Sequence, residues 1–345
     1  MIDKNEIEIM KSWTYTQPPL LSAICLAFNH EDYISQALDG MLMQETDFPF
    51  EIVINDDCST DNTVAILKEY AVKYPSIIRL ILQKENQYSK GIKIETLLIK
   101  EAVGKYIAIC EGDDYWTDPH KLQIQLDAMR SIKNCQMSFH SALDVWEDKS
   151  YNDSISTKRA NGNRLFTTRE VILGGGGFCP TASLVIEKEA IAEMPKWYYG
   201  PQNGDYYLQI FGSLKGGALY IDRTMSVYRR NAAGSWSSNM QDLEIRESQF
   251  EKMVLVLDAM DRHFKEKYHA EINQIKSDWY LGLAVVYLRN SCFEKFDLAI
   301  EESYRLAIRR SNKLLLNEFL RKFPHVLLSI VELKKKLHKF LAAKH

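Results

Sequence analysis

The sequence predicts an α/β fold with a mostly parallel central sheet, followed by a helical extension at the C-terminus. Three apolar runs in the first 110 residues each end in polar or acidic residues, and a helical pattern separates each run from the next. This alternation is typical of βαβ units, whose crossovers bring the carboxyl ends of parallel strands to one edge of the sheet. Open α/β sheets bind ligands at that edge.

The first strand is predicted at residues 21–28, where the chain is almost continuously apolar. Such a run is typical of a strand that is buried on both faces. It leads into the polar residues 29–32, and a helical pattern follows at residues 33–43. The polar residues therefore lie between a strand and a helix, at the ligand-binding edge.

The second strand is predicted at residues 51–55 and leads into Asp56 and Asp57. A Ser-Thr-Asp turn and a helical pattern at residues 64–74 follow. Ser, Thr and Asp are preferred helix N-caps. The pattern alone leaves open whether Asp56 and Asp57 only cap that helix or bind a ligand.

The third strand is predicted at residues 106–110 and ends in Glu111, Gly112, Asp113 and Asp114. Adjacent carboxylates repel each other, and burying them is unfavourable unless a cation neutralises them. Oxygen ligands of this kind favour Mg²⁺ or Mn²⁺, usually shared with substrate phosphates. The motif therefore indicates a metal-dependent enzyme that acts on a nucleoside diphosphate compound.

The three motifs together resemble those of family-2 glycosyltransferases. Residues 21–29 are similar to the family's opening strand, VSVIIPTYN, and residues 54–61 are similar to its VVDDGSTD motif. Residues 111–114 lie where the family has its DXD metal motif. The order and the spacing agree, over roughly residues 20–240. The resemblance implies a GT-A fold and a nucleotide-sugar donor.

The resemblance also implies roles for individual residues. Asp57 would bind the base, Asp113 the ribose side of the nucleotide, and Asp114 a divalent cation, Mn²⁺ or Mg²⁺, on the diphosphate. Such a cation would stabilise the leaving nucleoside diphosphate as a Lewis acid. Three further residues are implied near the nucleotide: Ala27, Phe28 and Glu31.

The chain departs from the family pattern at several positions without losing a carboxylate that the mechanism needs. Leu26 and Ala27 replace the common Pro-Thr pair, Glu111 replaces an Asp, and Cys58 replaces the common Gly. Glycine often serves where the backbone needs a positive φ. The geometry of the turn at Cys58 is therefore left open.

Inverting sugar transfer needs a general base that deprotonates the acceptor hydroxyl on the face opposite the leaving group. The resemblance places this base at Asp205, where Gly204 replaces the usual Glu. Without the resemblance, Asp205 would be interpreted as the N-cap of a helix at residues 206–214.

Four further side chains are candidates with an ordinary alternative. Lys93 either meets the donor phosphates or lies on a solvated helix face. Arg229 and Arg230 either pair with phosphate or form a solvated surface pair. Trp116, next to the metal motif, either stacks on a sugar ring or packs in the core.

The segment between the metal motif and residue 237 also gives structural expectations. The four glycines at residues 174–177 are not a phosphate loop, because the Gly-Lys-Ser/Thr ending is missing. They predict a flexible loop instead. Residues 220–222 and 225–230 predict a pair of short strands.

Composition excludes several classes. Of the 345 residues, 46% are hydrophobic and 26% charged, and the net charge is -3, so there is no nucleic-acid signature. Six scattered cysteines without a CxxC motif indicate reduced, cytoplasmic usage. No signal peptide or membrane-spanning run is expected.

Three segments are predicted: an N-terminal segment at residues 1–19, a glycosyltransferase domain at 20–237 and a helical extension at 238–345. From residue 313 onward, the sequence contains eight Lys or Arg and only two Glu, and apolar residues are interleaved with them. A basic amphipathic helix of this kind suits the anionic inner face of the cell membrane. A solvated terminal helix or a partner-binding helix remains an alternative.

The combined interpretation is an inverting, metal-dependent glycosyltransferase. It would move a sugar from a nucleotide donor, UDP-sugar by preference, to a saccharide or lipid-linked acceptor in cell-surface polysaccharide synthesis. A non-catalytic sugar-nucleotide or carbohydrate-binding module is the alternative, although such a module would tolerate loss of Asp114 or Asp205, and both are present. A nucleotidyltransferase would carry a Gly-rich basic loop, which residues 27–32 lack.

Overall fold

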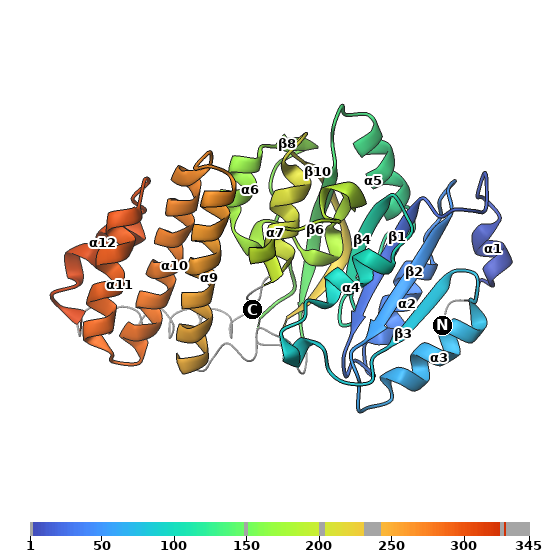
Figure 1. Ribbon diagram of the computed structural model, residues 1–345, viewed down its shortest axis with the longest axis horizontal. Coiled ribbons are helices and arrows are strands. Elements are labelled where there is room, and N and C mark those ends of the chain that lie inside the picture. Colours follow the sequence, from blue (N-terminus) through green and yellow to red (C-terminus); the bar gives the residue numbers. More distant parts are fainter. Residues whose placement is uncertain (1–2, 148–150, 200–203, 231–242, 325–327, 329–345) are drawn as a thin grey trace. The chain divides into compact units, whose positions relative to one another are not determined.

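The computed structural model describes residues 3–147, 151–199, 204–230, 243–324 and 328. They form a ten-stranded sheet flanked by helices, with further helices in the C-terminal part of the chain (Figure 1). The predicted α/β class is confirmed. Within these ranges, no helix combines the length and the apolar character needed to cross a membrane.

The first half of the sheet is parallel, in the order β3-β2-β1-β4. Its strands are β1 (Leu21–Ala27), β2 (Phe50–Asp56), β3 (Ile78–Leu82) and β4 (Tyr106–Glu111). The ends of β1, β2 and β4 agree with the predicted ends within one residue. Because the four strands run in the same direction, their carboxyl ends meet at one edge of the sheet.

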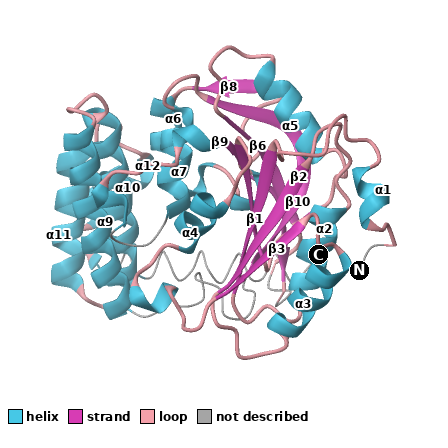
Figure 2. Cartoon of the chain, turned by 45° about the vertical axis from the view of Figure 1, so that its right-hand side comes forward, coloured by secondary structure: helices cyan, strands magenta, loops and turns pink. Residues whose placement is uncertain are grey.

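Helices cover both faces of this parallel half (Figure 2). Three of them, α2 (Ile34–Leu42), α3 (Thr63–Lys73) and α5 (Lys121–Arg130), share one hydrophobic core with alternate residues of β1 and β2. On the opposite face, α4 (Ile94–Glu101) contacts the same two strands. The spacing of apolar residues explains the docking of α2, because its buried side chains recur at three- and four-residue intervals. These side chains are Ile34, Ala37, Leu38 and Met41.

The second half of the sheet is mixed. Here β9 (Val185–Glu187) lies antiparallel between β4 and β6 (Met137–Trp146), and β10 (Ala218–Arg230) runs parallel to β6. The edge strand β5 (Tyr115–Trp116) pairs antiparallel with β10. Two short strands extend the sheet, β7 (Ser154–Ser156) on β6 and β8 (Arg164–Phe166) on β10.

The predicted pair of short strands at residues 220–222 and 225–230 is wrong, because both lie in β10. Its register against β6 shifts between Ile221 and Thr224 and again between Thr224 and Ser226. Such bulges let one strand absorb residues that break the apolar alternation. The continuous strand carries its last residues back beside β5, directly after the acidic motif.

The loop predicted at residues 174–177 is also wrong in part. Gly174 is the last residue of α6 (Thr168–Gly174), and residues 176–178 form a single 3₁₀ turn. A capping box at Thr167 starts α6. Further along the chain, the helix predicted at residues 206–214 is present as α7 (Gly204–Ser213), with slightly earlier ends.

The N-terminal segment is folded against the sheet domain. Its helix α1 (Glu6–Met10) begins with a capping box at Asn5, and Ile9 is buried in the shared core. The Tyr74 hydroxyl donates a hydrogen bond to the carbonyl of Lys4 at 3.0 Å. The segment therefore packs on α3.

By its internal contacts the chain divides into two compact units, Met1–Ser238 and Asn239–His345. As a boundary between independent domains, the division after residue 237 stays a prediction. The described helices of the second unit are α9 (Leu243–His263), α10 (His269–Arg289), α11 (Phe293–Leu306) and α12 (Asn312–Leu320).

The second unit has a hydrophobic core of its own, formed chiefly between α10 and α11. Leu288 and Phe296 are fully buried in it. Most of the predicted basic amphipathic end, residues 325–327 and 329–345, lies outside the described residues.

Candidate functional site

The candidate site lies at the carboxyl edge of the parallel half of the sheet. The register pairs Ala27 with Asp56 and Leu26 with Glu111, so the three strand ends are level. The N–H of Asp57 donates to the carbonyl of Ala27 at 2.9 Å, and the N–H of Gly112 donates to the carbonyl of Leu26 at 2.8 Å. The motifs that were found separately in the sequence therefore adjoin in the fold.

The loops after β1 and β2 are joined by side-chain hydrogen bonds. The Asn29 side-chain oxygen accepts from the N–H of Thr60 at 2.8 Å. The N–H of Glu31 donates to Asp61 at 3.1 Å, and the Glu31 carboxylate accepts from the N–H of Asn62 at 2.9 Å. Glu31 is exposed, but one of its oxygens already holds the neighbouring loop.

Asp56 supports the turn that follows β2. Its carboxylate accepts from the N–H of Ser59 at 2.9 Å and from the Ser59 hydroxyl at 2.5 Å. Inside this turn, Cys58 has a φ of 67°, in the left-handed region that favours glycine. The turn thus keeps the conformation of a glycine although a cysteine stands there.

Asp57 is buried and bonds to a different segment. Its two carboxylate oxygens accept from the backbone N–H groups of Gln87 at 2.7 Å and Tyr88 at 3.0 Å. The N-cap interpretation is wrong for both Asp56 and Asp57, because Asp61 accepts from the N–H of Thr63 at the start of α3. Asp57 joins the end of β2 to the loop before α4.

Two aromatic rings are exposed around these loops. Phe28, which directly follows β1, is 43% exposed, and Tyr88 is 46% exposed. The preceding residue, Ala27, is buried. An exposed flat ring beside a polar edge offers a stacking surface to a planar ligand.

The acidic motif has one buried carboxylate, Asp114, and two half-buried carboxylates, Glu111 and Asp113. Asp114 is 1% exposed, and its Oδ1 accepts from the backbone N–H of Arg229 at 2.9 Å. Its Oδ2 is buried and has no hydrogen-bond partner among the described residues. Burial, with Asp113 and Glu111 adding, holds the pKa of Asp114 well above its ordinary value. Asp113 itself is half-buried.

Glu111 shares this unfavourable environment. Burial raises its pKa to about 8, and the charges of Asp113, Asp205 and Glu95 act in the same direction. This environment favours the protonated form of Glu111 in the free protein at neutral pH. Neutralisation by a cation is the alternative to protonation.

The donor set suits a hard divalent cation that the substrate helps to bind. Within the described ranges, no three His, Cys, Asp or Glu side chains are arranged to hold a metal ion by themselves. Mg²⁺ commonly uses one or two carboxylates and completes its shell with water and substrate phosphates. The half-buried Asp113 carboxylate, beside Glu111 and Asp114 whose pKa values burial raises, fits that kind of site.

Arg229 supports the motif from the end of β10. It is 7% exposed, its guanidinium donates to the backbone carbonyl of Asp113, and it stacks 4.7 Å from the ring centre of Tyr115. The interpretation as a solvated surface pair is therefore wrong for Arg229. Arg230 forms an ion pair with Asp144 at 2.9 Å.

Asp205 is half-buried in the first turn of α7, inside the helix and not at its N-cap. Its carboxylate faces the Thr181 hydroxyl at 3.4 Å. Burial raises the pKa of Asp205, and the charge of Glu95 adds to the increase. Hydrogen bonds from the Tyr206 backbone and the Thr181 hydroxyl, and the charge of Lys93, oppose it.

Lys93 lies beside Asp205 and not on a solvated face. It is 8% exposed, and its ammonium lies 4.9 Å from the ring centre of Tyr198. Burial lowers its pKa, and the charges of Glu95 and Asp205 oppose this. The solvated-helix interpretation is therefore wrong.

Trp116 is part of the core. It is 1% exposed, and its indole N–H donates to the carbonyl of Ala182 at 2.8 Å. A ring that is buried to this extent cannot stack on a sugar, so the core interpretation is confirmed.

Sequence reasoning missed two residues near Asp205, Glu95 and Tyr198, which belong to no motif. Together with Thr181 they come from three separate elements. Only the tertiary contacts bring them together. The glycine at position 204, where the family usually has Glu, is the one departure from the family pattern directly beside Asp205.

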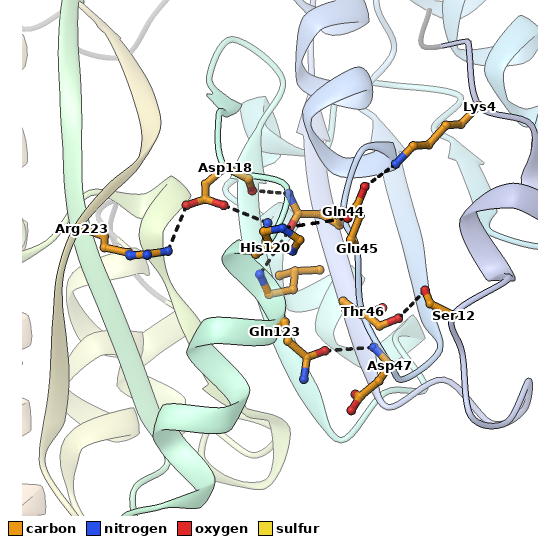
Figure 3. Close-up of polar contacts among 11 residues, drawn as sticks. Lys4, Ser12, Gln44, Glu45, Thr46, Asp47, Asp118, His120, Gln123 and Arg223 are labelled. Atoms are coloured by element: carbon orange, nitrogen blue, oxygen red, sulfur yellow. Dashed lines mark hydrogen bonds and ion pairs between the residues drawn. The ribbon is translucent and has the colours of Figure 1, made fainter.

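A shallow depression of about 530 Å³ lies elsewhere, between the N-terminal segment and α5. Residues 44–47 line it and directly precede β2, so it is at the amino edge of the sheet. Its polar groups bond to each other, as Figure 3 shows. Lys4 pairs with Glu45 at 2.6 Å, and Gln44 donates to the carbonyl of Asp118 at 2.9 Å. These contacts fasten the segment to the domain.

Comparison with known proteins gives one family and several relatives. The model of the family described as glycosyl transferase family 2 matches residues 22–194. The uncharacterised protein Rv1520 of Mycobacterium tuberculosis is 34% identical over 248 residues, which are 70% of this chain and 67% of that protein.

Two solved structures are similar in fold. Staphylococcus aureus TarS 1–349 in complex with UDP-GlcNAc aligns with a TM-score of 0.60 at 18% identity, covering 88% of this chain and 86% of that one. The mannosyltransferase PcManGT from Pyrobaculum calidifontis, in complex with GDP-Man and Mn²⁺, aligns with a TM-score of 0.51 at 15% identity. It covers 94% of this chain and 89% of that one.

Proposed function

This chain belongs to glycosyl transferase family 2, and we propose that it is an inverting, metal-dependent enzyme that uses a nucleotide-sugar donor. Its fold is the GT-A fold that the sequence predicted. UDP-sugar is the first donor to test, because TarS is similar in fold and was solved with UDP-GlcNAc. GDP-sugars come next, because PcManGT was solved with GDP-Man.

The observation that carries the proposal is that the predicted motifs meet at one edge of the sheet, where Leu26 pairs with Glu111 and Ala27 pairs with Asp56. Asp205, from α7, adds its charge there and helps to raise the pKa of Glu111. A transferase needs such an arrangement, because the leaving diphosphate and the attacking hydroxyl lie on opposite sides of the same anomeric carbon.

The nucleoside would lie against the loops after β1 and β2. Phe28 offers its exposed ring to the base. Asp57 is proposed to contact the base through a remaining lone pair, since each carboxylate oxygen can accept more than one hydrogen bond. Ala27 and Glu31 border the same loops, Ala27 through its backbone.

We propose that the cation binds to Asp113, which the sequence assigned to the ribose side, and not to Asp114. Asp113 is half-buried and open to a ligand, whereas Asp114 is 1% exposed and fixes β10 through the N–H of Arg229. The bound cation, Mn²⁺ or Mg²⁺, would stabilise the charge of the leaving diphosphate. Asp114 would stabilise the turn after β4 and add negative charge around the cation.

Asp205 is proposed as the general base. Its carboxylate takes the proton of the acceptor hydroxyl while that oxygen forms the bond to the anomeric carbon. The bond to the diphosphate breaks, and the diphosphate leaves with the electron pair. Partial burial makes Asp205 a stronger base than an exposed carboxylate. Lys93 would keep it ionised between turnovers.

The acceptor is proposed to be a saccharide or a lipid-linked saccharide of a cell-surface polysaccharide. TarS is named as a poly(ribitol-phosphate) β-N-acetylglucosaminyltransferase, which acts on a polymer. We place the reaction in the cytoplasm at the inner face of the membrane, where the basic end from residue 313 onward would meet anionic lipid.

The first test is thermal stability with UDP, GDP and dTDP, each with Mn²⁺, with Mg²⁺ and with a chelator. A ligand at 100 times its Kd stabilises the folded state by about 2.7 kcal/mol. We expect stabilisation by one nucleotide that disappears with the chelator. Absence of a shift with every nucleotide and both cations would contradict the proposal.

A further inference from the structure

Glu95 reaches the candidate base from another element of the fold. It lies in the first turn of α4, and its Oε1 accepts a hydrogen bond from the Tyr198 hydroxyl at 3.0 Å. A Cβ built on Gly204 would lie 1.8 Å from the same Oε1. The Glu95 carboxylate therefore fills the space beside the residue that precedes Asp205.

This arrangement explains why position 204 is a glycine. Any side chain there would have to displace the Glu95 carboxylate or the Tyr198 hydroxyl, which would be 3.1 Å from the built Cβ. A backbone without Cβ is the one that allows such close approach. The glycine at position 204 therefore makes room for the Glu95 carboxylate.

Resting on the proposed function, in which Asp205 is the base, we propose that Glu95 is its positioning residue. The Glu95 carboxylate, held by Tyr198 against Gly204, stands beside the start of α7 and directs the Asp205 carboxylate away from itself, toward the side of Thr181. Like charges at short range repel, and they disfavour the ionised form of each other. Glu95 therefore also strengthens Asp205 as a proton acceptor.

The surroundings of Asp205 contain one opposing charge of note, Lys93, whose ammonium lies over the Tyr198 ring. Lys93 interacts with both carboxylates, so it moderates the repulsion without cancelling it. The titratable or charged groups whose charges act on Asp205, or on which Asp205 acts, come from α4, β4, α7 and the segments before α7. They are Lys93, Glu95, Glu111, Cys179, Tyr198 and Tyr207.

The geometric part is tested without any activity assay, by melting temperatures of the full chain. Gly204→Ala should lower the melting temperature by a few degrees in the parent, because its methyl group meets the Glu95 carboxylate. In the Glu95→Ala background, Gly204→Ala should lower it much less. The effect of alanine on the unfolded chain is the same in both backgrounds and cancels. Equal losses in both backgrounds would overturn the placement of Glu95.

The electrostatic part is tested with Glu95→Gln, which keeps the size of the side chain and an oxygen for the Tyr198 hydroxyl. We expect the pKa of Asp205, followed by carbon-13 NMR of its carboxyl group, to fall by about one unit. The acid limb of kcat/KM should move to lower pH by the same amount. Tyr198→Phe, which leaves both charges in place, serves as the control and should shift the limb less.

A swap gives a readout that a merely structural role would not produce. Glu95→Ala combined with Gly204→Glu places a carboxylate on α7 instead of α4, and we expect the acid limb to return toward that of the parent. An unmoved Asp205 pKa in Glu95→Gln would overturn the inference.

Failure of the proposed function and failure of the proposed role of Glu95 give different results. If the parent transfers no sugar, the proposed function fails, while the melting temperatures and the NMR titration still decide the position of Glu95. If the parent transfers sugar and Glu95→Gln keeps the parent acid limb, the inference fails and the function stands.

Discussion

At the scale of single residues, the site is dominated by carboxylates in unfavourable surroundings. Burial raises the pKa of Glu111, Asp114 and Asp205 together. A structure tolerates such a cluster at the expense of stability, and strongly perturbed carboxylates gather at functional sites for that reason. A single substitution at each of these residues can therefore test its role separately.

Asp205→Asn should abolish transfer while donor binding persists. The amide keeps the shape of the side chain but cannot accept the acceptor proton. A loss of at least about 10²-fold in kcat is expected for a general base. Transfer rate and nucleotide-induced thermal shift are measured side by side. A transfer rate equal to that of the parent would remove Asp205 from the mechanism.

Asp113→Asn and Asp114→Asn should differ. With Asp113→Asn, we expect the stabilisation by nucleotide to become independent of Mn²⁺, because the open carboxylate is lost. With Asp114→Asn, we expect the metal-dependent shift to remain in part and the free protein to change in stability. The reverse outcome would restore the cation to Asp114, as the sequence had indicated.

Glu111 should make stability depend on pH. Its pKa is about 8 in the folded protein against an ordinary value of 4.5. Between these values the folded state binds more protons than the unfolded state, so the free energy of unfolding falls as pH rises through this window. Glu111→Gln should therefore gain stability relative to the parent as pH rises from about 5 to 8, by up to a few kcal/mol.

Urea unfolding at pH 5 and at pH 8 measures this difference. Glu193→Gln is the matched control, because Glu193 is an exposed acid outside the site. A gain from Glu111→Gln that is the same at both pH values would show that Glu111 ionises normally.

At the scale of elements, loop geometry positions the nucleotide side of the site. The turn after β2 depends on Asp56 bonding to Ser59 and on the positive φ of Cys58. A left-handed conformation costs roughly 1–2 kcal/mol for a residue with a Cβ. The turn is maintained because two neighbouring strands and the loop at residues 29–31 over-determine it.

Substitutions at Cys58 should follow this conformation. Cys58→Gly is expected to leave the free energy of unfolding unchanged within about 1 kcal/mol, because relief of strain is offset by the entropy of the unfolded chain. Cys58→Val, β-branched at the same φ, should cost more, about 1–2 kcal/mol. Urea unfolding compares the two, and a valine variant as stable as the glycine variant would contradict the turn geometry.

At the scale of the whole molecule, the two compact units separate chemistry from the C-terminal helices. All proposed site residues lie in Met1–Ser238, whereas the basic end lies in Asn239–His345. A helical unit with a basic end is expected to bring the enzyme to an anionic surface, where a lipid-linked acceptor would be found.

Vesicle binding tests this expectation. The full chain should sediment with vesicles that contain anionic lipid and much less with neutral ones, and added salt should release it, since each basic residue contributes on the order of 1 kcal/mol. A chain that ends at residue 324 is the control. Equal binding by both chains would assign the end to a partner or to solvent.

The local sequence determined the elements around the strand edge and the family. Apolar runs followed by polar or acidic residues define β1, β2 and β4 within one residue, because burial on both faces requires a continuous apolar strand. Local patterns also give the helical periodicity of α2, and the order of motifs identifies the fold class.

Only the tertiary structure decided which side chains share an environment. Lys93 has the local pattern of a solvated lysine, yet it is 8% exposed beside Asp205. Glu95 has no motif, yet its carboxylate fills the space at Gly204. Burial and pairing depend on which distant elements pack together, and a local pattern contains no information about that. Short-range periodicity therefore fixes the parallel strands that carry the site, whereas long-range packing fixes the chemistry of the site.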